Sequence, residues 1–113
     1  MTIFRGTIVK LYEIAMARSG DKTDTSNVAV WPNDDAHWPL LREQLTVEKV
    51  RERFGSLVKG EITRYEYPNL HVLNFVMTEA LRGGVGMGLT LDPHGKAYQT
   101  LILEIDVDVP ASA

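Results

Sequence analysis

The stretch IVKLYEIAMARSGDKTDTSNVAVW, residues 8–31, decides the fold because it places one polar run between two apolar segments. Ten of the eleven residues at 17–27 are polar or glycine. Residues 6–17 carry apolar side chains on both alternating faces, which is typical of a strand in a covered sheet. Residues 26–31 form a second, shorter strand that ends at Pro32. The pattern therefore predicts two strands joined by a polar connection.

Helical signals follow in residues 35–54, which predict either one bent helix or two short ones. Asp34 or Asp35 can cap the first turn, because a carboxylate accepts hydrogen bonds from free backbone N–H groups. Thr46 is a second predicted N-cap, before the sequence VEKVRERF. Gly55 predicts the end of this helical region.

The second half of the chain predicts one more strand, a buried helix and a closing hairpin. The strand is EITRYEY, residues 61–67, and the helix is LHVLNFVMTEALR, residues 70–82, capped by Asn69. Residues 89–91 and 97–109 form the hairpin. The predicted order is ββαβαββ. It indicates an α+β fold of the ferredoxin-like sandwich type, with one mostly antiparallel sheet and helices over one face.

Length and composition limit the classes of function. The 113 residues fit a single domain, residues 1–113, and the formal net charge of −3 argues against a general nucleic-acid binder. The absence of cysteine excludes a disulfide framework, a thiolate nucleophile and a cysteine-based zinc site. No apolar run approaches the roughly 20 residues of a membrane-spanning helix, and the N-terminus lacks a signal peptide. We expect a cytoplasmic protein with no membrane contact.

The polar run contains no general ligand-binding motif. In SGDKTD, Asp21 separates Gly20 from Lys22, so the contiguous Gly-Lys-Ser/Thr of a phosphate-binding loop is missing. Asp21, Asp24 and Asn27 are oxygen donors three residues apart, but they lack the alternating spacing, the central glycine and the final glutamate of an EF-hand loop. We therefore expect no metal and no cofactor.

Two interpretations of the run remain open. Its side chains can satisfy their own backbone in a solvated turn. Alternatively, the charges of Arg18, Asp21, Lys22 and Asp24 can hold one another in a fixed network. Such a network either braces the connection or orients a ligand.

The chain resembles the AtuA-like ferredoxin-fold domain over most of its length, from about Lys10 to Ile105. The resemblance rests on LYEIAMARSGDKTDTSNVAV, on LLREQLTVEKVRERFGSLVKGEITRYEYPNLHVLNFVMTEALRGGV and on LTLDPHGKAYQTLILEIDV. In that family the domain forms the C-terminal part of the acyclic terpene utilisation protein AtuA and also occurs as a stand-alone short protein. The resemblance implies a role in acyclic terpenoid catabolism through acyl-CoA intermediates, without an assigned chemical step.

We consider three functions on this basis. The first is an accessory or subunit module that pairs with a larger AtuA-type chain or with itself as a homo-oligomer. The second is a small enzyme or ligand-binding protein for an anionic or acyl-CoA-type molecule, for which the sequence offers no nucleophile–base pair. The third is a purely structural polar network. The candidate ligand-binding residues are Arg18, Ser19, Asp21, Lys22, Asp24, Asn27, Asn69 and Asn74.

Overall fold

The computed structural model describes residues 6–22, 25–80 and 96–109 of the chain. The strands and helices, in chain order, are β1 (Thr7–Lys10), η1 (Leu11–Glu13), β2 (Ala15–Lys22), β3 (Thr25–Pro32), η2 (Asp35–His37), α1 (Trp38–Gln44), α2 (Val47–Phe54), η3 (Gly55–Leu57), β4 (Ile62–Tyr67), β5 (Val72–Met77), α4 (Lys96–Leu103) and β6 (Asp106–Val109). The η elements are single 3-10 turns.

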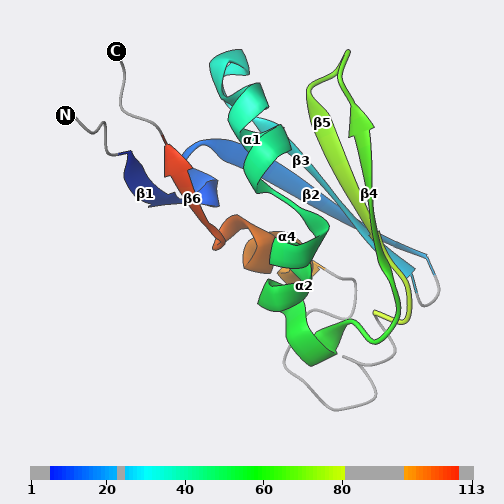
Figure 1. The fold of residues 1–113 in the computed structure, drawn as a ribbon. Helices are drawn as coiled ribbons and strands as arrows, with labels where there is room; N and C mark the ends of the chain where they lie inside the picture. Colours follow the sequence, from blue (N-terminus) through cyan, green and yellow to red (C-terminus); the bar gives the residue numbers. More distant parts are fainter. Residues whose placement is uncertain (1–5, 23–24, 81–95, 110–113) are drawn as a thin grey trace.

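The strands form two antiparallel sheets. The larger sheet has the order β2-β3-β5-β4, and a separate ribbon pairs β1 with β6. Figure 1 shows α1, α2 and α4 on one side of the larger sheet. From β3 onward, the order of strands and helices matches the βαββα part of a ferredoxin-like sandwich. In a ferredoxin-like sandwich the last strand follows the second helix. Here the edge strand next to β3 is β2, which comes before this unit in the chain instead of after α4.

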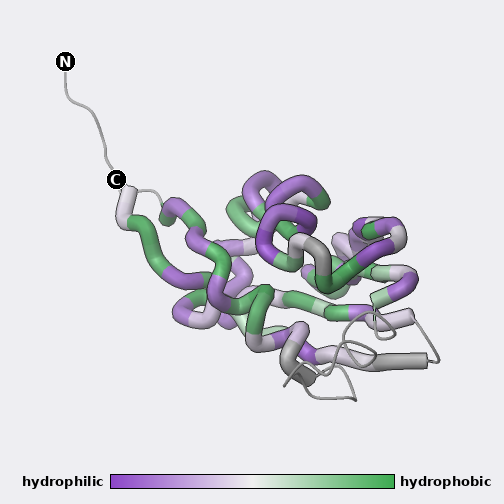
Figure 2. The backbone as a smooth tube through the Cα atoms, turned by 90° about the horizontal axis from the view of Figure 1, so that it is seen from below, coloured by the Kyte–Doolittle hydropathy of each residue, from purple (hydrophilic) through white to green (hydrophobic). Residues whose placement is uncertain are grey.

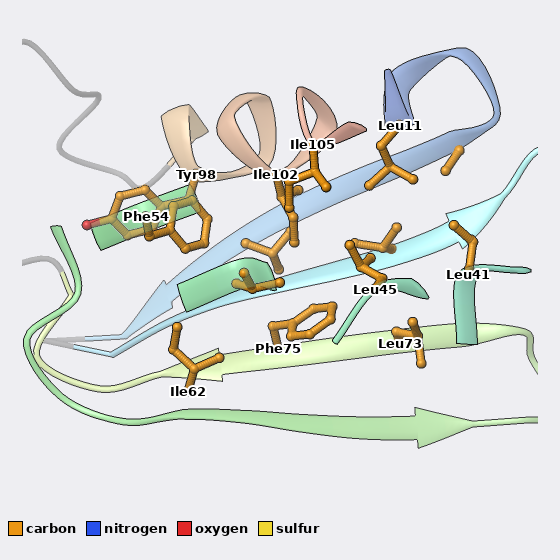
Figure 3. Close-up of a cluster of buried hydrophobic side chains, with 14 of the residues drawn as sticks. Leu11, Leu41, Leu45, Phe54, Ile62, Leu73, Phe75, Tyr98, Ile102 and Ile105 are labelled. Carbon is orange, nitrogen blue, oxygen red and sulfur yellow. The ribbon is translucent and has the colours of Figure 1, made fainter. Parts of the chain in front are cut away.

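The hydrophobic core lies between the larger sheet and the helices. Burial alternates along β3 and β5, so that Val28, Val30, Leu73, Phe75 and Met77 point toward the helices and are buried. Figure 3 shows side chains from α1, α2 and α4 converging with those of β4 and β5 on this layer. In Figure 2 the tube changes repeatedly between hydrophobic and hydrophilic residues, as expected when each strand or helix has one buried and one exposed side.

The local helix signals are confirmed. Asp34 accepts a hydrogen bond from the backbone N–H of Ala36 at 2.9 Å, and Thr46 accepts one from the N–H of Lys49 at 3.1 Å. The region 35–54 consists of two short helices, and Gly55 follows α2 with a φ of 54°. A residue with a Cβ is strained at that φ, which is why glycine ends this helix.

The predicted long first strand is wrong because the chain turns between β1 and β2. Leu11 begins η1 and is fully buried, and its N–H donates to the carbonyl of Ile105 at 2.8 Å. The carboxylate of Glu13 accepts from the N–H of Lys10 at 3.2 Å. These contacts let β1 leave the larger sheet and pair with β6 instead.

The predicted helix at 70–82 is also wrong, since residues 72–77 form β5 in the middle of the larger sheet. A central strand and a buried helix both show apolar residues on all sides, so the pattern alone does not separate them. The predicted cap Asn69 lies instead in the turn that joins β4 to β5. The N–H of Leu70 closes this turn by donating to the carbonyl of Tyr67 at 3.0 Å.

The predicted closing hairpin is replaced by α4 followed by the short strand β6. Tyr98 and Ile102 are four residues apart and both buried, which is helical spacing, and α4 packs against β2. The remaining predicted strand, residues 89–91, lies outside the described residues. The α+β class and the mostly antiparallel sheet are confirmed, but the described order is βββααββαβ rather than ββαβαββ.

Candidate functional site on the uncovered sheet face

The polar run at residues 17–27 is mostly strand. β2 continues to Lys22 and β3 begins at Thr25, so the run forms the two arms of a β-hairpin. The pairing places Gly20 opposite Asn27, and Ser26 donates from its hydroxyl to the carbonyl of Gly20 at 3.2 Å. Residues 17–22 and 25–27 of the run are therefore ordered by backbone pairing rather than held as a free loop.

The register gives the larger sheet two faces of different character. One face is buried under the helices. No helix of the described residues packs on the other, which we call the open face. Three rows of side chains cross the open face. They are Met16, Trp31, Val72 and Tyr67; Arg18, Ala29, Asn74 and Tyr65; and Gly20, Asn27, Val76 and Thr63.

The open face exposes large apolar side chains. Met16 is 53% exposed, Tyr65 is 48% exposed and Tyr67 is 44% exposed, whereas Trp31 is half-buried between neighbours on the sheet. These side chains come from the strands at both edges and from the centre of the sheet. They form an apolar and aromatic surface that lies open to solvent among the described residues.

A polar centre lies within this surface. Nδ2 of Asn27 donates to Oδ1 of Asn74 at 3.1 Å, which links β3 to β5. Oδ1 of Asn27 leans over β2, where an added Cβ at Gly20 would lie only 2.8 Å away. Glycine at this position therefore makes room for the Asn27 carboxamide. Arg18 is exposed in the adjacent row and makes no ion pair with a described residue.

The structure brings some predicted site residues together and separates others. Arg18, Asn27 and Asn74 share the open face. Ser19 points to the opposite face, where its hydroxyl is buried without a hydrogen-bond partner among the described residues. Asn69 is exposed in the β4–β5 turn, which lies at the other end of the sheet from the β2–β3 turn.

The predicted charge network is described only in part. For Asp21 and Lys22 the structure gives the backbone pairing with β3 and no side-chain placement. Asp24 lies outside the described residues. The network therefore stays a prediction.

His71 lies outside this polar centre, three residues before Asn74. It sits in the β4–β5 turn with a φ of 56°, and its ring stacks on Trp38 with the centroids 5.2 Å apart. Its Nδ1 contacts Oδ1 of Asp35 at 2.9 Å. These contacts hold the turn against the start of α1.

Two hollows lie elsewhere and contain none of the predicted site residues. One, of about 400 Å³, is lined by Ala36, His37, Pro39, Leu40, Glu43, Gln44 and Val109. The other, of about 320 Å³, lies beside the ion pairs Lys10–Asp106 and Arg53–Glu104. Because the charges at the second hollow are paired, it presents no strong field of one sign. Among the described residues, no group of three histidine or acidic side chains could hold a metal ion.

The apolar part of the open face was not predicted from the sequence. Met16, Trp31, Tyr65, Tyr67 and Val76 were read as parts of separate strands or of a helix. Alternation in VLNFVM was the available signal, because this segment buries every second residue. In ITRYEY the signal is weaker, since only Ile62 is buried. Only the pairing of β4 with β5 shows that their remaining side chains form one surface.

The fold and this face define an α+β sandwich with one sheet face covered by helices. The family model of the AtuA ferredoxin-like domain matches residues 9–108, and the chain therefore belongs to this family. No curated protein and no solved structure matches the chain. No helix among the described residues is long and apolar enough to span a membrane.

Proposed function

We propose that this chain is an accessory or subunit module of an AtuA-type system and binds a larger AtuA-type chain through its open face. The observation that carries the proposal is the open face itself, where apolar and aromatic side chains surround Arg18, Asn27 and Asn74. The family suggests acyclic terpenoid or acyl-CoA catabolism as the setting. No reaction is assigned to the chain.

The composition of the open face supports a protein partner. The centres of protein interfaces are enriched in tyrosine, tryptophan, methionine and arginine. Tryptophan, tyrosine and arginine also carry most of the binding energy where interfaces have been mapped by mutation. Trp31, Tyr65, Tyr67, Met16 and Arg18 supply these residue types on one sheet face. A partner that covers the face would remove their exposed apolar area from water, which favours association.

The polar centre supports specific docking. The Asn27–Asn74 hydrogen bond uses one donor and one acceptor, and each carboxamide offers further hydrogen-bonding capacity. A partner must match these groups, because a buried polar group without a hydrogen bond costs free energy. The guanidinium of Arg18, which makes no ion pair among the described residues, adds a preference for a carboxylate. The open face therefore favours a partner with an apolar surface and at least one acidic side chain.

A small anionic ligand of acyl-CoA type is the second candidate, and one observation favours it. Arg18 has no carboxylate partner among the described residues, and it stands beside apolar side chains that would suit an acyl chain. The same groups would then bind a phosphate or carboxylate of the ligand. Mass separates the two candidates, since a CoA ester is far smaller than a protein chain.

The experiment is native mass spectrometry of the protein purified from its own cells, with Arg18→Glu and Arg42→Glu prepared in the same way. Arg42 is an exposed arginine on α1, so its variant has the same charge change away from the open face. The proposal predicts a larger chain of the same family bound to the wild type and to Arg42→Glu but lost from Arg18→Glu. A CoA-sized adduct with that pattern would support the second candidate. Identical spectra for all three proteins would contradict both.

A further inference from the structure

The outer edge of β4 differs from the outer edges of β2 and β6. At β2, the N–H of Ser19 donates to Oε1 of Gln99 on α4 at 2.9 Å. At β6, Nε2 of Gln44 donates to the carbonyl of Asp108 at 2.6 Å. The N–H of Asp108 in turn donates to Oε1 of Gln44 at 2.8 Å. Side-chain amides thus satisfy backbone groups at both edges. Among the described residues, none places a side chain on the backbone of β4.

The pairing with β5 shows which groups of β4 point outward. The N–H of Thr78 donates to the carbonyl of Glu61 at 3.0 Å, so these two residues form a hydrogen-bonded pair. Such pairs alternate along an antiparallel ladder. The backbone groups of Ile62, Arg64 and Glu66 therefore face away from β5. Unpaired groups of this kind form a template for another strand.

We propose that this edge pairs with β4 of a second copy of the chain, antiparallel and across a two-fold axis. The choice of register follows from charge. In one register Arg64 lies opposite Glu66 of the second copy, and the symmetry repeats this pair. If the two-fold axis is moved by one residue toward the start of β4, Arg64 lies opposite Arg64 of the second copy. If it is moved by one residue toward the end of β4, Glu66 lies opposite Glu66 of the second copy. Opposite charges directly across a ladder stabilise it, whereas like charges destabilise it.

The two charged side chains are already held in place for such pairing. Nη1 of Arg64 donates to the carbonyls of Arg42 and Leu45 at 2.9 Å and 2.8 Å. Its Nη2 lies 2.6 Å from Oε2 of Glu66. A second copy adds an opposite charge to each group, giving an alternating network of four charges. Because Arg64 is fixed beforehand, less side-chain entropy is lost on pairing.

The open side of the same strand is also self-complementary. In this register Tyr65 lies opposite Tyr65 of the second copy, and Thr63 lies opposite Tyr67. Tyr65 and Tyr67 are both nearly half exposed in the single chain, so pairing buries aromatic surface. Aromatic pairs directly across an antiparallel ladder add to its stability. The two larger sheets then join into one, and their open faces form a continuous surface. This inference does not depend on the proposed AtuA-type partner.

The test is the molar mass in solution of the wild type, of Glu66→Arg and of Glu52→Arg, measured by light scattering after size exclusion. Glu52 is exposed on α2 and lines the hollow beside Lys10 and Asp106, so its variant is a matched control for charge. Wild type and Glu52→Arg should elute at twice the 12.7 kDa chain mass. Glu66→Arg should dissociate, with a dimer dissociation constant raised at least about tenfold. A monomeric wild type, or a dimer that survives in Glu66→Arg, would overturn the proposal.

A mixing experiment tests whether opposite charges pair across β4 of the two copies. Arg64→Glu alone should also be monomeric, because it places glutamate opposite Glu66 of the second copy. An equimolar mixture of Arg64→Glu with Glu66→Arg restores two opposite-charge pairs and should form a dimer containing one chain of each. A mixture of folded variants that stays monomeric would reject this register.

Arg64→Glu also removes the hydrogen bonds to the α1 carbonyls, so its folding must be checked by circular dichroism. If it does not fold, amide hydrogen exchange of the wild type tests the β4 pairing instead. The outward N–H groups of Arg64 and Glu66 should exchange more slowly as the protein concentration rises. Exchange that is fast at every concentration would mean that β4 pairs with no second copy.

Discussion

Replacing Gly20 by alanine tests the polar centre of the open face directly. A Cβ at this position would lie 2.8 Å from Oδ1 of Asn27 and 3.7 Å from its Cγ. The first distance is shorter than a normal contact, so the Asn27 carboxamide must move. Its movement breaks the hydrogen bond to Asn74, which spans 3.1 Å in the structure.

Two opposing effects set the magnitude. Glycine inside a strand is less stable than alanine by roughly 0.5–1 kcal/mol, and Gly20 has no positive φ that alanine would strain. Loss of the Asn27–Asn74 hydrogen bond costs about 0.5–1.5 kcal/mol. The two effects nearly cancel, so Gly20→Ala should change the free energy of unfolding by less than about 1 kcal/mol.

A double-mutant cycle measured by urea unfolding separates the two effects. In the Asn27→Ala background the hydrogen bond is already absent, so Gly20→Ala should stabilise by roughly 0.5–1 kcal/mol. The difference between the two backgrounds is the coupling energy, about 0.5–1.5 kcal/mol. If Gly20→Ala has the same effect in both backgrounds, Gly20 does not make room for Asn27, and our account of the polar centre is incorrect.

Three further predictions test the fold. Phe75→Ala should lower the free energy of unfolding by about 3–5 kcal/mol, because Phe75 is fully buried. Its neighbour Val76 is half-buried on the open face, so Val76→Ala should lower that free energy by about 1 kcal/mol or less. Equal losses in urea unfolding would contradict strand alternation in β5. Thr46→Ala should cost about 1 kcal/mol by removing the N-cap of α2, and a thermal scan that shows no loss would count against this cap. The hydrogen bond and charge of Asp106 raise the pKa of Lys10 above 10.5. The stabilisation by this pair should be complete below pH 10.5 and disappear as the pH rises through the raised pKa, and NMR titration should find no raised pKa in Asp106→Asn.

The sequence was sufficient where a signal acts within a few residues. Asp34, Thr46 and Gly55 each act on the backbone next to them, so the helical region at 35–54, its cap at Thr46 and its end at Gly55 were predicted, although the sequence left open whether it forms one bent helix or two short ones. The strand at 61–67 and the strand after the polar run were also predicted, since alternation between the two sides of a strand is a local pattern.

The sequence was insufficient where an apolar segment could suit either a helix or a strand. Residues 70–82 are apolar on nearly all sides, so their sequence suits either a helix or a strand. Residues 72–77 form a strand because they pair with β3 on one side and with β4 on the other. The segment after Lys96 shows the reverse case. It alternates like a strand, yet Tyr98 and Ile102 become buried only when it packs as a helix against β2. Tertiary packing overrides local preference in both segments.

The candidate site divides in the same way. The sequence by itself determined that Arg18, Asn27 and Asn74 were residues able to bind a ligand or partner, since their side chains carry charge and hydrogen-bonding groups. Only the tertiary structure decided that these three share one face while Ser19 and Asn69 do not. The physical reason is that strand register, which depends on residues far apart in the chain, determines which side chains lie next to one another.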